Sequence, residues 1–427
     1  MPDAGHDGIH NDPRRTPVVL LARRLPNAKA GGAYKNHRAH DLAAAVISHL
    51  VMESGINPLA INDVILGNAT GGGGNVARLA ALTAGLAESV PGLSVDRQCG
   101  SGLEAIILAC RLIQAGAGEL YLAGGVESIS TAPARAHRNA EGALEFYDRA
   151  QFAPLATGDP DAGVAAENVA RHYGITRARQ DAYAMESHTR ALAAQRNAAF
   201  ASELVPFADL AADQGIRGNL NARLMARFPP AFVAGGSVTA GNSCPFSDGA
   251  AVAVVTSLEH ARTLVAAGDT DTGASVGLAF RASAVAGNDP NLLGVGAARA
   301  MELLLASTGL GIEQVRHSRV EFNEAFAAQV LAVADLLDLD PVLFNHDGGA
   351  LALGHPYGAS GAVLVTRLLA QVQATSQQTP EAKSQPALET GSQARAAAGQ
   401  DAFAMLSMAG GMGLAAHFQT VDLRPQR

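Results

Sequence analysis

Short apolar runs alternate with longer stretches of helical periodicity over the first 130 positions. Residues 64–66 are a contiguous apolar run of the kind that forms a buried strand, and residues 119–123 predict another strand. Three other segments carry apolar side chains at helical spacing: 41–51, 78–87 and 103–113. Alternating strands and helices of these lengths predict a layered α/β domain.

The regular alternation breaks between about residues 130 and 232. This stretch is polar, is interrupted by prolines and contains two helical patterns, at 163–173 and 176–199. Strand-like apolar segments return at 250–255 and 320–322. The pattern therefore predicts a loop domain, about residues 130–248, that leaves the sheet, and such excursions commonly hold substrate.

Two glycine-containing segments each open an apolar helix. Gly100-Ser101-Gly102 opens the first, residues 358–361 open the second, and each helix is followed by a strand that ends in a glycine pair. The second copy is 30 positions longer, which matches an insertion over about residues 371–400, rich in Gln, Ala, Ser, Thr and Pro. We expect this insertion to be a mobile solvent loop. If the two copies stack, Cys99 and His355 meet at the helix starts.

Composition excludes several classes of function. The chain has 427 residues, 48% of them hydrophobic, and a formal net charge of -8, which gives no attraction to nucleic acid or to an anionic membrane. No stretch approaches the roughly 20 apolar residues of a membrane span. Residues 1–16 are polar and predict a flexible tail. Three cysteines without C-x-x-C spacing argue against a metal site or disulfide framework and fit a reducing cytoplasm.

Cys99 lies at a predicted strand-to-helix junction, between apolar Val95 and the helix that begins near Leu103. Unpaired backbone N–H groups and the positive end of the helix dipole favour a thiolate at such a position. The residue is then a candidate nucleophile for acyl transfer. The alternative is a small buried hydrophobic side chain, which many free cysteines are.

His355 and Asn323 are the partners that such a nucleophile needs. His355 lies between glycines, including Gly354, that let backbone and imidazole approach a ligand, and it can take a proton from a thiol. Asn323 follows a short strand, and its amide can help to bind an oxyanion. A structural histidine and a helix cap are the respective alternatives.

Several blocks in order along the chain resemble the thiolase family. They run from about residue 17 to 419 and comprise 95–127, 166–170, 239–250, Glu321–Phe326, 348–361 and 410–413. The resemblance implies a thiolase fold, with two βαβαβαββ halves stacked as a five-layered αβαβα body and an inserted loop domain. Residues 17–275 would form the N-terminal half and 276–427 the C-terminal half.

The resemblance also implies the chemistry. Acyl groups would pass between coenzyme A thioesters, with Cys99 as acyl carrier, His355 as its activating base, and Asn323 with His355 as one oxyanion site. The backbone N–H groups of Cys99 and Ala409 would form the second. Acyl-CoA and CoA would be substrates and products, no cofactor would be covalently bound, and the assembly would be a homodimer or homotetramer.

Ser407 is the main departure from the family pattern. Thiolases usually have a cysteine there that acts as acid and base, and a serine hydroxyl is a poor substitute. Asp161-Ala162 replaces a His-Met pair near the acyl group, and Cys244 replaces a serine that contacts pantetheine, where its role would be pocket packing. Arg223 and Arg227, with Arg217, could bind the coenzyme A phosphates, although surface arginines are an equal alternative.

Two classes of function follow. The first is an acyl-CoA C-acyltransferase that forms or cleaves 3-oxoacyl-CoA through acyl-Cys99. The second, favoured by Ser407, is a thiolase-like CoA-binding protein with impaired turnover, or with a non-standard condensing or thioester hydrolase activity.

Overall fold

The computed structural model describes residues 12–267, 275–377 and 399–424, and ten strands form its main sheet. The N-terminal part has the order β1-β8-β5-β3-β4 and the C-terminal part the order β9-β12-β11-β10. Antiparallel pairing of β1 with β9 at Val18 and Val19 joins the two parts, and the short β2 pairs with β8. The strands are β1 (Pro17–Arg24), β2 (Ala28–Lys29), β3 (Asp63–Gly67), β4 (Gly92–Val95), β5 (Leu120–Glu127), β8 (Ser247–Ser257), β9 (Val276–Gly287), β10 (Arg319–Phe322), β11 (Asp401–Met408) and β12 (Met412–Asp422).

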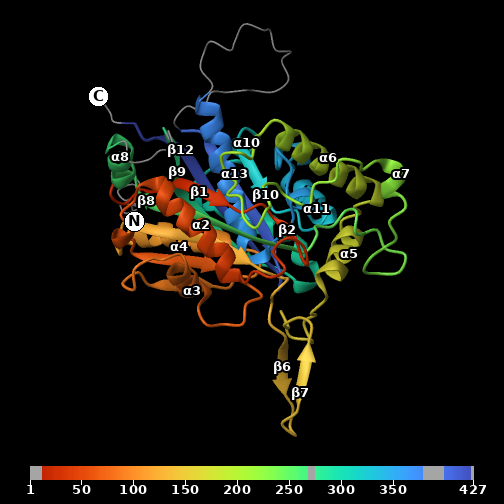
Figure 1. Ribbon diagram of the computed structural model, residues 1–427. Coiled ribbons are helices and arrows are strands. Elements are labelled where there is room, and N and C mark those ends of the chain that lie inside the picture. Colours follow the sequence, from red (N-terminus) through yellow and green to blue (C-terminus); the bar gives the residue numbers. More distant parts are fainter. Residues whose placement is uncertain (1–11, 268–274, 378–398, 425–427) are drawn as a thin grey trace, which may run out of the picture.

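Helices cover both outer faces and fill the space between the two sheet parts (Figure 1). One apolar cluster packs the outer helices on the N-terminal strands, another packs the central helices between both sets of strands, and a third packs the remaining helices on the C-terminal strands. The molecule therefore has five layers: outer helices, N-terminal strands, central helices, C-terminal strands and outer helices again. The helices are α2 (Ala39–Ser54) and α3 (Val76–Thr83) on one side, α4 (Ser101–Ala115) and α13 (Tyr357–Gln377) in the centre, and α9 (Gly296–Thr308), α10 (Ile312–Arg316) and α11 (Ala327–Leu337) on the other, with α8 (Leu258–Ala267) beside β1 and β8.

Glycines let the two central helices approach closely. A Cβ on Gly102 of α4 would lie 2.7 Å from the carbonyl oxygen of Gly358, and a Cβ on Gly361 of α13 would lie 2.4 Å from the backbone nitrogen of Leu103. Neither helix start has room for a side chain at these positions. The two helices of the predicted internal repeat are therefore α4 and α13, which lie side by side in the central layer.

Between β5 and β8 the chain leaves the sheet, and the hairpin of β6 and β7 projects away from the body (Figure 1). Helices α5 and α6 match the two helical patterns predicted for this region, and both pack against α11. The remaining elements are β6 (Arg135–Arg138), β7 (Leu144–Tyr147), α5 (Ala162–His172), α6 (Arg177–Arg196), α7 (Ala222–Met225), α12 (Ala350–Leu353) and the 3₁₀ helices η1 (Pro58–Ala60), η2 (Pro290–Val295) and η3 (Pro341–Leu343).

The structure differs from the sequence prediction at several segment ends. Helix α3 stops at Thr83 because Gly85, with φ of 81°, turns the chain before residue 87. Within the predicted tail, residues 12–16 form a turn in which the Arg15 guanidinium donates to the carbonyl of Gln114; residues 1–11 lie outside the described residues. Helix α13 continues to Gln377, and residues 378–398 of the predicted insertion also lie outside them. No helix in the described ranges is long and apolar enough to cross a membrane.

Candidate active site

Cys99 lies between the end of β4 and the start of α4, as the sequence predicted. Gln98 adopts a positive φ of 50°, and the Gly100 N–H donates to the carbonyl of Arg97, so the chain turns sharply into the helix. Ser101 fixes the turn because its hydroxyl donates to the Gln98 carbonyl and accepts from the Arg97 N–H. The half-buried thiol packs beside the central apolar cluster.

The Cys99 thiol is neutral in this environment. Burial raises its pKa to about 12, and the backbone N–H groups of Cys99 and Ala409 oppose this effect, while the carboxylate of Glu127 adds to it. The predicted preference for the thiolate is therefore wrong, because the loss of hydration outweighs the two N–H contacts. The contact from Ala409 nevertheless brings that N–H to the sulphur, as an oxyanion site requires.

His355 is buried at the start of α13, three positions before Gly358, just as Cys99 is three positions before Gly102. The contact between the two helix starts therefore brings these residues to the same junction. The Ser360 hydroxyl donates to the Pro356 carbonyl, so its oxygen accepts from His355 Nδ1 at 2.6 Å. This bond leaves the lone pair on Nε2.

The imidazole of His355 is also neutral, since burial lowers its pKa to about 3. A neutral thiol and a neutral imidazole therefore face the site at physiological pH. Proton transfer between them has to accompany the attack on a substrate, because a preformed ion pair is disfavoured in this dry environment.

Asn323 lies next to His355 at the end of β10. Its Nδ2 is 3.4 Å from His355 Nε2, its backbone N–H donates to the Met405 carbonyl, and its own carbonyl accepts from the side chain of Gln329. These backbone bonds fix the residue in place. Asn323 Oδ1 is buried and has no hydrogen-bond partner within the described ranges.

The carboxylate of Glu127, at the end of β5, ties the two halves together beside the site. It accepts from Gly358 N–H at the start of α13, and from the side chains of Asn68 and Thr70 and the N–H groups of Ala69 and Thr70 in the N-terminal half. Glu127 was not among the site residues predicted from the sequence. The available signal was a carboxylate at the end of an apolar segment that forms a buried strand.

Ser407 lies on β11, two residues before Ala409. Its hydroxyl donates to the Gly294 carbonyl at 2.7 Å and accepts from the Ala297 N–H at 3.0 Å, and the side chain is buried. The next residue, Met408, packs with the central apolar cluster. The one hydroxyl proton of Ser407 is thus committed to a backbone carbonyl.

The residues expected to contact coenzyme A are spread around the loop domain. Cys244 is half-buried, and its N–H donates to the Ala325 carbonyl, which places it beside the turn that carries Asn323. Gly354 has φ of 103°, and a Cβ there would lie 2.4 Å from the Ser247 hydroxyl. Arg223 and Arg227, on and after α7, are exposed, and within the described ranges neither forms an ion pair.

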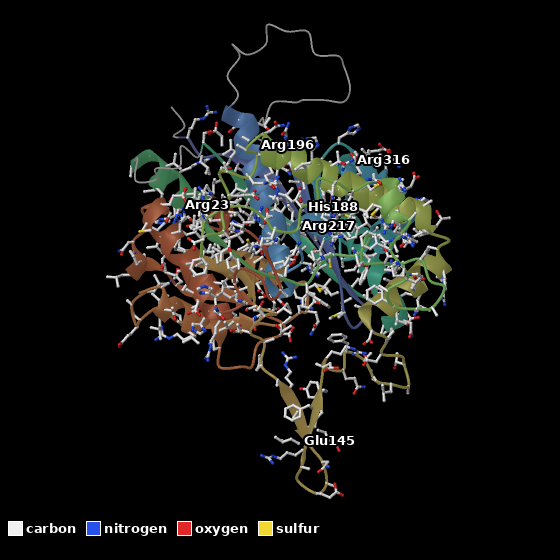
Figure 2. The ribbon with its side chains drawn as sticks, turned by 45° about the vertical axis from the view of Figure 1, so that its right-hand side comes forward. Arg23, Glu145, His188, Arg196, Arg217 and Arg316 are labelled. Carbon is white, nitrogen blue, oxygen red and sulfur yellow. The ribbon has the colours of Figure 1, made fainter. Side chains whose placement is uncertain are left out.

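Arg217 lies beside His188. Its backbone N–H donates to His188 Nδ1 at 3.1 Å, and Figure 2 shows the two residues next to each other. Burial, with Arg217 and Lys29 nearby, lowers the pKa of His188 to about 4, so the imidazole stays neutral and accepts this bond. Within the described ranges, no group of three His, Cys, Asp or Glu residues could hold a metal ion.

A thiol, an imidazole of fixed tautomer and an amide at the junction of two stacked α/β halves define a site for acyl transfer. Comparisons with known proteins agree with this architecture. The family described as the thiolase N-terminal domain matches residues 17–259, and the thiolase C-terminal domain matches residues 276–397. The chain therefore belongs to the thiolase family.

Similar proteins come from bacteria and from human mitochondria. The chain is 42% identical over 359 residues to the "Putative acetyl-CoA C-acetyltransferase VraB" of Staphylococcus aureus (strain MRSA252), covering 82% of this chain and 92% of that protein. The crystal structure of the Bacillus anthracis acetyl-CoA acetyltransferase superposes with a TM-score of 0.82 at 32% identity, covering 95% of this chain and 99% of that one. Human mitochondrial 3-ketoacyl-CoA thiolase in complex with CoA gives a TM-score of 0.81 at 28% identity, over 95% of this chain and 98% of that one.

Proposed function

We propose that this protein is an acyl-CoA C-acyltransferase that forms or cleaves 3-oxoacyl-CoA through an acyl group on Cys99. The observation that carries the proposal is the junction of the two helix starts. There the Ala409 N–H reaches the Cys99 sulphur, and His355 presents an unprotonated Nε2. Membership of the thiolase family supports the same reaction.

In the first half-reaction, His355 Nε2 takes the proton of Cys99 as the sulphur attacks the thioester carbonyl. The N–H groups of Cys99 and Ala409 bind the oxygen as it gains negative charge. When the carbonyl re-forms, the bond to coenzyme A breaks, and its thiolate takes the proton back from His355. The products are acyl-Cys99 and free CoA.

In the second half-reaction of synthesis, Asn323 Nδ2 donates to the enolate oxygen of a second acyl-CoA. The α-carbon of this enolate attacks the acyl carbonyl, the bond to Cys99 breaks, and the Cys99 thiolate takes up the proton released from the α-carbon as 3-oxoacyl-CoA leaves. This step needs a base for the α-proton. Ser407 is poorly suited to this role, since its hydroxyl is held between Gly294 and Ala297. That observation favours the second candidate function, a CoA-binding protein that acylates Cys99 but condenses slowly or hydrolyses thioesters.

The proposal also covers how coenzyme A binds, how the subunits assemble and where the protein is located. Coenzyme A would enter over the loop domain, with Cys244 and Gly354 next to its pantetheine arm and Arg223 and Arg227 near its phosphates. Residues 17–275 and 276–427 would be the two halves of each subunit, assembled as a homodimer or homotetramer. A cytoplasmic location fits the three free thiols.

Mass spectrometry after incubation with acetyl-CoA tests the proposal. We expect a stoichiometric acetyl adduct on the peptide that contains Cys99, and no adduct on the Cys99→Ser variant. His355→Asn should slow adduct formation by about 100-fold or more, as loss of a general base does. Absence of any adduct with short, medium and long acyl thioesters would overturn the proposal. An adduct without thiolysis of 3-oxoacyl-CoA would favour the second candidate.

A further inference from the structure

A small cavity of about 20 Å³ is lined by Asn323 and Ser360, two residues that contact His355. Residues from the end of β10, from the segment around α12 and from α13 line it, among them Glu321 and Arg367. A cavity needs roughly 10–15 Å³ to hold one water molecule, and the water needs two to four polar partners. This cavity is large enough for one.

Two buried polar atoms on residues that line this cavity have no hydrogen-bond partner within the described ranges: Asn323 Oδ1 and Arg367 Nε. Both residues are 1% exposed. One atom accepts and the other donates, and leaving such groups unpaired in a dry interior costs about 1–3 kcal/mol each. A water molecule carries both the donor that Asn323 Oδ1 lacks and the acceptor that Arg367 Nε lacks.

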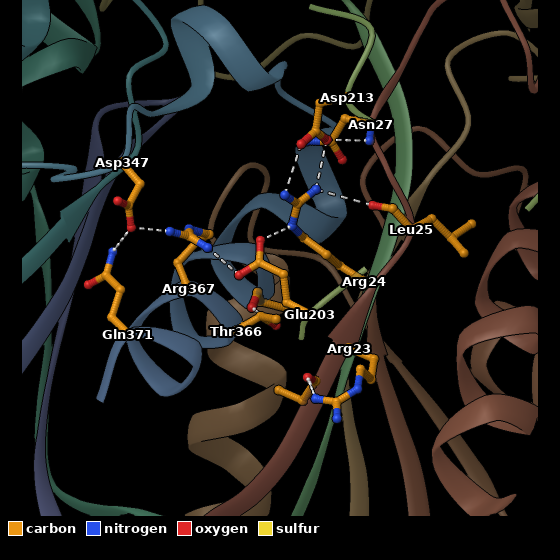
Figure 3. Close-up of polar contacts among 12 residues, drawn as sticks. Arg23, Arg24, Leu25, Asn27, Glu203, Asp213, Asp347, Thr366, Arg367 and Gln371 are labelled. Atoms are coloured by element: carbon orange, nitrogen blue, oxygen red, sulfur yellow. Dashed lines mark hydrogen bonds and ion pairs between the residues drawn. The ribbon is translucent and has the colours of Figure 1, made fainter. Parts of the chain in front are cut away.

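The cavity also borders a buried cluster of charges, which Figure 3 shows in part. The Arg367 guanidinium lies between the carboxylates of Glu203 and Asp347 and stacks on the ring of Phe200, and the side chain of Gln371 donates to both Asp347 and Glu321. Arg367 therefore has little freedom to turn its Nε elsewhere.

We infer that one water molecule occupies this cavity, accepts from Arg367 Nε and donates to Asn323 Oδ1 and the Glu321 carboxyl group, and thereby aims the Asn323 amide N–H at His355. Glu321 and Arg367 are then positioning residues for the oxyanion site. This inference rests on the proposed function only for its catalytic consequence. The water itself can be tested without activity.

The protonation state of Glu321 is consistent with a hydrogen bond to this water. Burial raises its pKa to about 8, since the attraction of Arg367 is offset by repulsion from Asp347 and Glu203, and Arg319 on the same strand lies nearby. Glu321 is therefore mainly protonated at neutral pH. Glutamine at this position is an uncharged mimic of similar shape, and leucine removes the polar group altogether.

The experiment combines a crystal structure with kinetics of the full-length protein. At a resolution better than about 2 Å, we expect a single ordered density peak within hydrogen-bond distance of Arg367 Nε and Asn323 Oδ1, and no peak in Glu321→Leu. In thiolysis of 3-oxoacyl-CoA, Glu321→Leu should lower kcat by about 10-fold, less than the 10²–10³ loss typical of deleting an oxyanion donor outright. KM should change less than about twofold, and Glu321→Gln should restore most of kcat.

A double-mutant cycle separates positioning from general destabilisation. In an Asn323→Ala background, Glu321→Leu should have little further effect on kcat, because the amide that the water aims is already absent. An empty cavity in the wild-type map, or equal losses of kcat in both backgrounds, would overturn the inference. Failure of the wild-type protein to acylate Cys99 would overturn the proposed function instead. The electron density in the cavity would still show whether the water is present.

Discussion

Replacement of Ser407 with alanine removes a hydroxyl that makes two buried hydrogen bonds. The Ala297 N–H near the start of α9 would lose its acceptor, and the Gly294 carbonyl would lose its donor. An unsatisfied buried polar group costs about 1–3 kcal/mol, so the pair predicts a loss of about 2–6 kcal/mol in the free energy of unfolding. The side chain is only 5% exposed, which leaves little water to compensate.

Two measurements report on this substitution. Urea unfolding followed by far-ultraviolet circular dichroism should show a lower midpoint, and hydrogen–deuterium exchange should speed up in the peptide that contains Ala297. Acetylation of Cys99 by acetyl-CoA should proceed at nearly the wild-type rate, since Ser407 takes no part in that half-reaction.

The opposite pattern would refute the structural role of Ser407. If Ser407→Ala unfolds at the wild-type urea concentration, exchanges normally near Ala297 and yet loses the condensation step alone, the hydroxyl takes part in proton transfer. Acylation measured in the same preparations serves as the internal control, because a misfolded site would lose both half-reactions.

Three further outcomes are expected. Ser407→Cys should raise the rate of thiolysis or condensation, because a thiol is held less firmly by weak hydrogen bonds and has a pKa nearer neutrality; an unchanged rate in steady-state assays would mean that another group already moves the proton. Alkylation of Cys99 by iodoacetamide should stay slow until the pH is well above 8.5, as its raised pKa requires, with fully buried Cys110 unmodified in the same mass spectra; rapid labelling at pH 7 would contradict a neutral thiol. Gly102→Ala should destabilise the protein by about 1–3 kcal/mol in urea unfolding, because its Cβ would overlap α13, whereas Gly287→Ala, with its nearest neighbour 4.0 Å away, should have little effect; equal midpoints for the two variants would argue against close packing of the central helices.

Local patterns were sufficient to predict the layered α/β fold and the position of Cys99 at a strand-to-helix junction. Apolar periodicity depends on neighbouring residues, and the glycines that follow Cys99 and those on either side of His355 signal sharp turns regardless of the rest of the chain. The projecting hairpin of β6 and β7 was not predicted. Its strands are exposed along most of their length, so they carry no buried face that would produce an apolar pattern.

The sequence by itself determined which chemical groups are present and roughly where each lies along the fold: Cys99, His355 and Asn323 at the ends of strands or the starts of helices. Only the tertiary structure decided the protonation states of Cys99 and His355 and the tautomer of His355. Burial makes the Cys99 thiol and the His355 imidazole neutral, and Ser360 selects the histidine tautomer. Hydration and hydrogen bonding depend on which distant segments of the chain pack around a residue, and a local sequence pattern does not determine that packing.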